Sequence, residues 1–239
     1  MLWLLPLLSF LIGSIPFGLL LGKAKGIDIR EHGSGNIGST NVFRTLGKKS
    51  GILCLLLDAL KGFLPVFLAI NLCRIEGTNP LLGVEFLTNL SSPLPKSDQF
   101  SGQSIQVLTA LAAILGHNFC PWLGFKGGKG IATTGGALLA LMPAAVVILI
   151  LIFTIVTFTT KYVSLGSIAT GIALPILTGL GSYYHIKAGD LPPDGWNKPL
   201  FLFSLVAGAL AVWKHRPNLA RLKAGTEHRI GQKKKSPTP

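Results

Sequence analysis

Residues 131–160 read IATTGGALLALMPAAVVILILIFTIVTFTT and contain no charged side chain. A single helix of that length would be about 45 Å long, whereas the hydrocarbon core of a bilayer is about 30 Å thick. Pro143 lies near the middle, where a proline interrupts a helix. We therefore expect a hairpin of two short spans, about 130–142 and 144–160, that turns near Met142. The first is too short to cross upright, so both a full crossing and a re-entrant segment stay open.

The overall composition is typical of an integral membrane protein. Of the 239 residues, 49% are hydrophobic and only 13% are charged, and the mean hydropathy is +0.56. In soluble domains about a quarter of the residues are charged. Further charge-poor runs predict spans at about 1–22, 51–73, 104–123, 163–184 and 199–213. We expect an all-α, polytopic membrane protein with about seven transmembrane helices, one domain over 1–231 and a disordered basic tail at 232–239.

The distribution of charge orients these spans. No basic residue precedes the first run, and Lys23, Lys25 and Arg30 follow it, opposite to the order in a cleaved signal peptide. We therefore expect a retained first span, an external N-terminus and a cytoplasmic C-terminus. Seventeen Lys and Arg residues then fall in cytoplasmic segments and four in external ones, in agreement with the positive-inside rule. Topology thus explains most of the net charge of +13, and we expect no nucleic-acid partner.

A glycine-rich basic segment, here called the lysine loop, immediately precedes the charge-free run. It comprises residues 124–130 and reads GFKGGKG. Glycine lets backbone N–H groups turn toward an anion, a following helix N-terminus adds free N–H groups, and lysine supplies charge. It is not a Walker A motif, since glycine follows the second lysine. The loop either binds phosphate or simply contacts lipid headgroups. In the first case the ligands are Lys126, Lys129, Gly127, Gly128 and Thr133.

A second polar segment lies between the first two predicted spans. Residues 33–44 read GSGNIGSTNVFR and contain more hydroxyl and amide groups than a connector needs. A binding loop is favoured over a plain connector. The candidate residues are Ser34, Gly35, Asn36, Thr40, Asn41 and Arg44.

A third polar segment follows the last predicted span. Residues 215–230 read HRPNLARLKAGTEHRI, and their arginines alone would suit anionic lipid. That explanation does not account for the histidine, asparagine and glutamate among them. His215, Asn218, Leu219 and Leu222 can share one face of a short helix lying on the membrane. The candidate residues are His215, Asn218, Arg221 and Glu227.

Single polar residues in or beside the spans are more ambiguous. His117 ends the third span next to the lysine loop, so structural and functional interpretations are equally open. Ser164 lies in a tight cytoplasmic turn near the other segments. Asp58 and Lys61 interrupt the second span at a spacing of three residues, which favours a structural ion pair near its cytoplasmic end over a functional pair. The cysteines, predicted to pack in the core, are Cys54, Cys73 and Cys120.

Three segments together resemble a known family. SGNIGSTNVFR, GHNFCPWLGFKGGKGIAT and HRPNLARLKAGTEHR are similar to the three motifs of the bacterial acyl-phosphate:glycerol-3-phosphate acyltransferases, and the likeness extends from about residue 10 to 230. The resemblance implies a seven-span enzyme of the bacterial inner membrane with a cytoplasmic active site. It would move a fatty acyl group from acyl phosphate to the 1-hydroxyl of glycerol 3-phosphate, giving lysophosphatidic acid and phosphate at the start of phospholipid synthesis. Membrane lipids surround it, no metal or cofactor is implied, and the oligomeric state stays open.

The resemblance also suggests roles for individual residues. The expected catalytic residues are Ser34, His117, Lys129 and His215. The expected substrate-binding residues are Gly35, Asn36, Thr40, Asn41, Arg44, Lys126, Gly127, Gly128, Thr133, Ser164, Asn218, Arg221 and Glu227. The general base stays open between His117, His215 and the phosphate of the substrate. Three features depart from the family pattern: Ser39, where alanine is usual, Cys120-Pro121 before the lysine loop, and a long loop at 75–103 on the opposite face.

Two rival functions are less compatible with the sequence. A transporter of a phosphorylated metabolite would carry its polar groups near the bilayer midplane, whereas most of them here lie in loops on one side. A lipid phosphatase often uses clustered acidic metal ligands, but the nine Asp and Glu residues are scattered.

Overall fold

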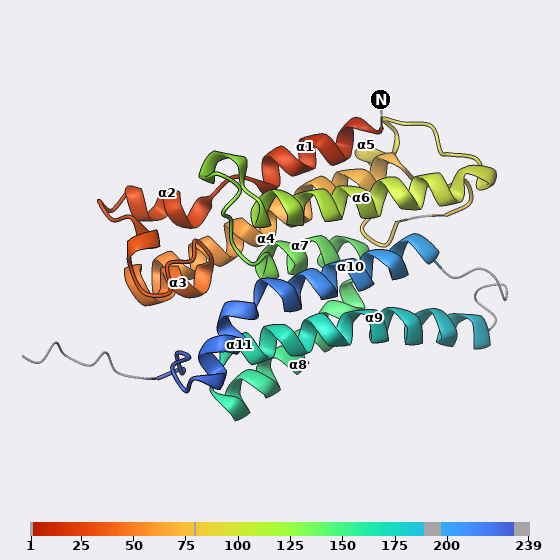
Figure 1. Ribbon diagram of the computed structural model, residues 1–239. Helices are drawn as coiled ribbons and strands as arrows, with labels where there is room; N and C mark the ends of the chain where they lie inside the picture. Colours follow the sequence, from red (N-terminus) through yellow and green to blue (C-terminus); the bar gives the residue numbers. More distant parts are fainter. Residues whose placement is uncertain (1, 79, 189–196, 232–239) are drawn as a thin grey trace, which may run out of the picture.

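The computed structural model describes residues 2–78, 80–188 and 197–231 (Figure 1). The predicted tail at 232–239 lies outside these residues, as does most of the loop predicted between the last two spans. Within the described residues the protein is helical and contains no β-strand; an isolated bridge pairs Ile75 with Leu94. The expectation of an all-α architecture is therefore confirmed.

The N-terminal half contains the helices α1 to α6. α1 (Leu4–Gly13) and α2 (Phe17–Lys23) form one apolar segment that is broken at Pro16, since a proline interrupts a helix. The remaining helices are α3 (Ser39–Leu46), α4 (Lys48–Leu72), α5 (Glu85–Thr88) and α6 (Gln99–Asn118). Short 3₁₀ turns occur at η1 (Ile29–Glu31), η2 (Lys96–Asp98) and η3 (Pro121–Leu123).

The C-terminal half contains α7 (Ile131–Leu141), α8 (Pro143–Thr160), α9 (Val163–Lys187), α10 (Lys198–Lys214) and α11 (Arg216–Lys223). α7 and α8 are separated at Met142, so the predicted division of the charge-free run is confirmed. Pro143 is the first residue of α8, a position at which its missing N–H costs no helical hydrogen bond.

The long helices form two groups that enclose α7. In Figure 1, α1, α4 and α6 run together on one side, and α8, α9 and α10 run together on the other. α7 packs mainly against α4, where the backbones approach closely at two glycines. A Cβ on Gly62 would overlap the Thr133 carbonyl, and one on Gly136 would overlap the Ala59 carbonyl. Small residues at such crossings are a common feature of membrane helices.

The outer surface is suited to lipid. Among the residues that the structure describes, five segments are long and apolar enough to cross a membrane: 4–23, 48–72, 96–123, 143–160 and 163–187. Large apolar side chains face outward along them; Leu56 is 60% exposed and Ile155 is 62% exposed. The protein is therefore an integral membrane protein with several apolar helices. α7, with 11 residues, is much shorter than these segments.

The polar residues of α4 pair inside the protein. Asp58 and Lys61 are buried, and Lys61 Nζ lies 2.7 Å from Asp58 Oδ1, so the predicted ion pair is confirmed. Lys61 also donates a 2.7 Å hydrogen bond to the Ile15 carbonyl at the break between α1 and α2. The cysteines are buried, as predicted, and form no disulfide: Cys54, Cys73 and Cys120.

Candidate active site

A cavity of about 470 Å³ lies between the two groups of helices. One end is polar and is lined by residues of α3, the lysine loop, α11 and the junction at His215 that precedes α11. The other end is apolar and extends between α7, α8, α9 and α10. The polar lining includes Ser34, Asn36, Ser39, Thr40, Asn41, Arg44, Asp58, His117, Lys129, Ser164, Ser167, Thr170, His215, Asn218 and Glu227. The apolar lining includes Leu138, Leu139, Val146, Leu149, Ile150, Phe153, Leu174, Ala207 and Ala211.

Asn41 holds the 33–44 loop in place. Its side-chain Nδ2 donates to the carbonyls of Ile29 and His32, at 2.9 and 3.1 Å. Its Oδ1 accepts a 2.8 Å hydrogen bond from the Ser34 amide. Gly35, at φ +68°, adopts a left-handed conformation that suits glycine, so its part in the loop is a turn. This bracing presents Ser34 to the cavity.

Lys129 is the central cation of the polar end. Its Nζ donates a 2.5 Å hydrogen bond to Asn218 Oδ1, which joins the lysine loop to α11 across 89 residues of sequence. Burial lowers the pKa of the Lys129 ammonium to about 8; the Glu227 carboxylate opposes this shift, while the Arg221 and Arg44 guanidinium groups add to it. Lys129 therefore lies in a site with more positive than negative charge.

The rest of the lysine loop is arranged differently from the prediction. The amides of Gly127 and Gly128 donate to the Asn118 and His117 carbonyls, at 3.3 and 3.0 Å, so they are not directed at an anion. Glycine is needed here for close packing, because a Cβ on either residue would overlap the end of α6. Lys126 is exposed and does not line the cavity. Of the predicted ligands in this loop, Lys129 alone lines the cavity.

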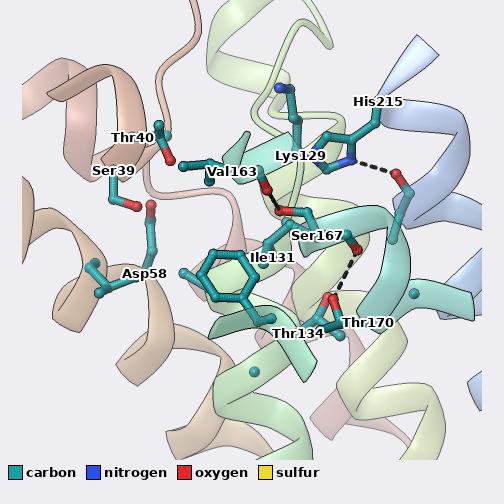
Figure 2. Close-up of a pocket in the computed structure, with 18 of the residues that line it drawn as sticks. Ser39, Thr40, Asp58, Lys129, Ile131, Thr134, Val163, Ser167, Thr170 and His215 are labelled. Atoms are coloured by element: carbon teal, nitrogen blue, oxygen red, sulfur yellow. Dashed lines mark hydrogen bonds between the residues drawn. The ribbon is translucent and has the colours of Figure 1, made fainter. Parts of the chain in front are cut away.

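His215 occupies the junction between α10 and α11. Its Nδ1 lies 2.7 Å from the Ala211 carbonyl (Figure 2). A carbonyl only accepts, so Nδ1 carries the proton and Nε2 keeps a free lone pair. Burial, and secondarily the Lys129 charge, lower the pKa of His215 to about 4. The ring is therefore neutral at physiological pH.

Glu227 connects the C-terminal segment to the site. Its Oε1 accepts hydrogen bonds from Ser164 Oγ (3.0 Å) and Asn218 Nδ2 (2.6 Å). Its Oε2 accepts from Arg221 Nε at 2.7 Å. Although burial acts to raise it, these hydrogen bonds and the charge of Arg221 keep the pKa of Glu227 below its usual value. Arg221 reaches the site through this contact and does not line the cavity.

The residues that were predicted to share one membrane-facing side of the tail helix do not all face the same way. His215 and Asn218 are buried and line the cavity, whereas Leu219 is 39% exposed. The hydrogen bonds of His215 and Asn218 with α10, Lys129 and Glu227 turn that face inward. α11 is therefore a wall of the site in addition to any contact with lipid.

Most of the predicted site residues come together. The predicted residues that line the cavity are Ser34, Asn36, Thr40, Asn41, Arg44, His117, Lys129, Ser164, His215, Asn218 and Glu227. Those that do not are Gly35, Lys126, Gly127, Gly128, Thr133 and Arg221. Thr133 is fully buried at the contact between α7 and α4.

Sequence reasoning missed several polar residues of the lining. Ser39 and Asp58 form part of the wall across from Lys129 and His215 (Figure 2). Ser167 and Thr170 donate their hydroxyl protons to the carbonyls of Val163 and Ser167, at 3.0 and 2.9 Å. Their spacing after Ser164 is helical, and that periodicity is the signal that could have identified this face of α9.

The fold and the cavity define the class of protein: a helical integral membrane protein whose cavity joins a cationic end to an apolar channel. A sequence model described as glycerol-3-phosphate acyltransferase matches residues 3–225. The chain therefore belongs to the glycerol-3-phosphate acyltransferase family.

Individual relatives agree with this assignment. Over 228 residues the chain is 42% identical to the glycerol-3-phosphate acyltransferase of Desulforamulus reducens, covering 95% of this chain and 94% of the relative. Over 233 residues it is 40% identical to glycerol-3-phosphate acyltransferase 2 of Moorella thermoacetica, covering 97% and 99%. The transporter alternative is not supported.

Solved structures give the same result. The chain superposes on the glycerol 3-phosphate form of PlsY (YgiH), an integral membrane glycerol 3-phosphate acyltransferase, with a TM-score of 0.76. The identity is 34%, and 96% of each chain is covered. For the lysophosphatidic acid form of that protein the TM-score is 0.74 at 33% identity, covering 96% of this chain and 95% of the other.

Proposed function

We propose that the protein transfers a fatty acyl group from acyl phosphate to the 1-hydroxyl of glycerol 3-phosphate. The products are lysophosphatidic acid and phosphate. The observation that carries this proposal is the continuous cavity, which offers cations and hydrogen-bond donors at one end and an apolar channel at the other. An acyl chain would lie between α7, α8, α9 and α10, and both phosphate groups would bind at the polar end.

The polar end has the charge needed for two anions. Lys129, Arg44 and Arg221 outnumber the carboxylate of Glu227, and the other carboxylate of the cavity wall, Asp58, is paired with Lys61. α3 begins at the cavity wall after Gly38 without a side-chain cap, so its first N–H groups remain available to an anion. We assign Lys129 to the phosphate of the acyl donor, and Arg44 and Asn218 to glycerol 3-phosphate. The hydrogen bond between Lys129 and Asn218 brings the two sites next to each other.

Acyl phosphate is a mixed anhydride with a good leaving group, so a covalent acyl-enzyme is not required. The glycerol hydroxyl attacks the acyl carbonyl carbon, the bond to the phosphate oxygen breaks, and Lys129 stabilises the departing negative charge. His215 Nε2 accepts the hydroxyl proton, since two bound anions raise its low pKa, and passes it to the released phosphate. Ser34 orients the hydroxyl or the carbonyl. Holding both substrates together supplies several kcal/mol through proximity.

We also propose that the protein crosses the bacterial inner membrane seven times. α7 and α10 add to the five long segments, so that the N-terminus is external and the C-terminus cytoplasmic. The excess of seventeen Lys and Arg residues over four supports a cytoplasmic site. The three polar segments then open to the compartment that supplies the two phosphorylated substrates.

The test gives purified protein acyl phosphate, acyl-CoA or acyl-carrier protein separately, each with labelled glycerol 3-phosphate. Labelled lysophosphatidic acid is expected from acyl phosphate. A K129M variant should lose roughly 10²–10³-fold in kcat, whereas K49M, at the exposed start of α4, should retain activity. Product formation from acyl-CoA alone would overturn the assignment of the donor.

A further inference from the structure

The buried ion pair of α4 lies in the wall of the cavity. Asp58 and Lys61 are 2% and 3% exposed, and Asp58 lines the cavity. Taking two charges out of water costs several kcal/mol per ion, and well-packed apolar side chains often replace such a pair without loss of stability. Ionisable groups inside membrane helices are retained mainly where they have a function. Stability alone is therefore a weak explanation for Asp58.

The pair contacts two other parts of the protein. Lys61 bonds the Ile15 carbonyl at the break between α1 and α2. The same carboxylate oxygen that pairs with Lys61 lies 3.6 Å from His117 Nδ1, at the end of α6. This distance is slightly longer than a hydrogen bond. In the described part of the chain His117 Nδ1 is buried and has no hydrogen-bond partner.

His117 in turn packs against the lysine loop. Its carbonyl accepts the Gly128 amide at 3.0 Å. The ring also lies against the same residue, because a Cβ on Gly128 would overlap His117 Nε2. Lys129 is the next residue in sequence. The His117 ring therefore packs directly against the residue that precedes Lys129.

We propose that Asp58 is a positioning residue for acyl transfer. It holds the His117 ring against Gly128 by accepting a hydrogen bond from Nδ1, and so fixes the backbone from which Lys129 reaches the phosphate of the acyl donor. Loose hydrogen bonds in a substrate-free site commonly shorten when substrate binds. This role rests on the proposed function, since it concerns the same lysine.

A double-mutant cycle tests the coupling. D58N and H117A should each lower kcat/KM for acyl phosphate by roughly 10²-fold, the cost of a small misplacement of a reacting group. D58N/H117A should fall no further than the worse single variant, because both residues act through one contact. C54A, which removes a thiol 3.6 Å from the other Asp58 oxygen, is the matched control and should keep full activity. Losses that multiply in the double variant would overturn the proposal.

A variant that removes both charges distinguishes a lost positioning role from misfolding. D58N alone leaves the buried ammonium of Lys61 without its carboxylate, which is destabilising. D58N/K61M removes both charges and should regain the melting temperature of the wild type while keeping the loss of kcat/KM. Wild-type kcat/KM in this variant would show that Asp58 has only a structural role.

A readout that does not depend on acyl transfer distinguishes this proposal from the proposed function. The rate at which an amine-reactive reagent modifies Lys129, followed by mass spectrometry, should differ between the wild type and both D58N/K61M and H117A. If the wild type fails to use acyl phosphate, the proposed function is lost but a changed labelling rate still supports the positioning role. An unchanged labelling rate contradicts the positioning role.

Discussion

At Lys129, burial and neighbouring charges act on one ammonium group. Because its pKa is lowered to about 8, the group is charged below that pH and loses its charge above it. If the charge holds the acyl phosphate, kcat/KM for this substrate should decline as pH rises through about 8. K129R should move this decline to higher pH, since a guanidinium stays protonated.

The measurement is the pH profile of kcat/KM for wild type, K129R and the exposed control K49R. The test compares the pH at which kcat/KM declines and not the absolute rates, because arginine also changes the geometry of the contact. An alkaline decline that is the same in wild type and K129R would mean that another group titrates.

The residue types of the site were predictable, but their partners were not. The composition of the polar segments predicted Lys129, Asn218 and Glu227 as site residues. The hydrogen bond between Lys129 and Asn218 joins residues 89 positions apart and follows from tertiary packing. The glycines of the lysine loop also had two physical explanations, anion binding and close packing. The amides of Gly127 and Gly128 donate to backbone carbonyls of the protein, and these hydrogen bonds favour the explanation by close packing.

Among the helices, the contact between α4 and α7 is the most sensitive to side-chain size. Gly62→Ala would drive a methyl group into the Thr133 carbonyl. Overpacking of this kind costs about 1–3 kcal/mol, so the melting temperature in detergent should fall. Activity should fall with it, since α7 carries the lysine loop at its N-terminus.

The matched control is Gly181→Ala in α9, where no atom lies within 4 Å of the added Cβ. This variant should melt at the wild-type temperature or slightly above, because alanine favours helix. Equal melting temperatures for Gly62→Ala and Gly181→Ala would mean that α4 and α7 can move apart without loss of stability.

Helices were the most predictable part of the fold. Lipid leaves backbone groups without water, so an apolar run must form a helix, and the predicted span at 51–73 closely matches α4. The complete break at Pro16 and the inward face of α11 depend on contacts with other segments. Periodicity in one segment carries no information about such contacts.

For the whole molecule, the proposed topology makes a prediction about access. The native cysteines are buried, so introduced cysteines can be labelled against a low background. Lys126 and Lys96 are exposed, and the topology assigns them to opposite sides of the membrane. A membrane-impermeant maleimide should label K126C only from the cytoplasmic side and K96C only from outside.

Wild-type protein provides the background, and both variants should be fully labelled after the membrane is dissolved in detergent. Labelling of K126C and K96C from the same side would refute the seven-span arrangement. Labelling of K126C from outside alone would place the cavity mouth in the wrong compartment for its substrates.

The hydrogen bonds of Glu227 have a consequence for biosynthesis. His215, Asn218 and Glu227 are among the last described residues that a ribosome adds, yet they complete a site whose other walls are made much earlier. A nascent polypeptide can thus insert helices α1 to α10 before the pocket is complete. Catalytic competence should appear abruptly during translation, once Glu227 has been added and its carboxylate accepts the hydrogen bond of Ser164.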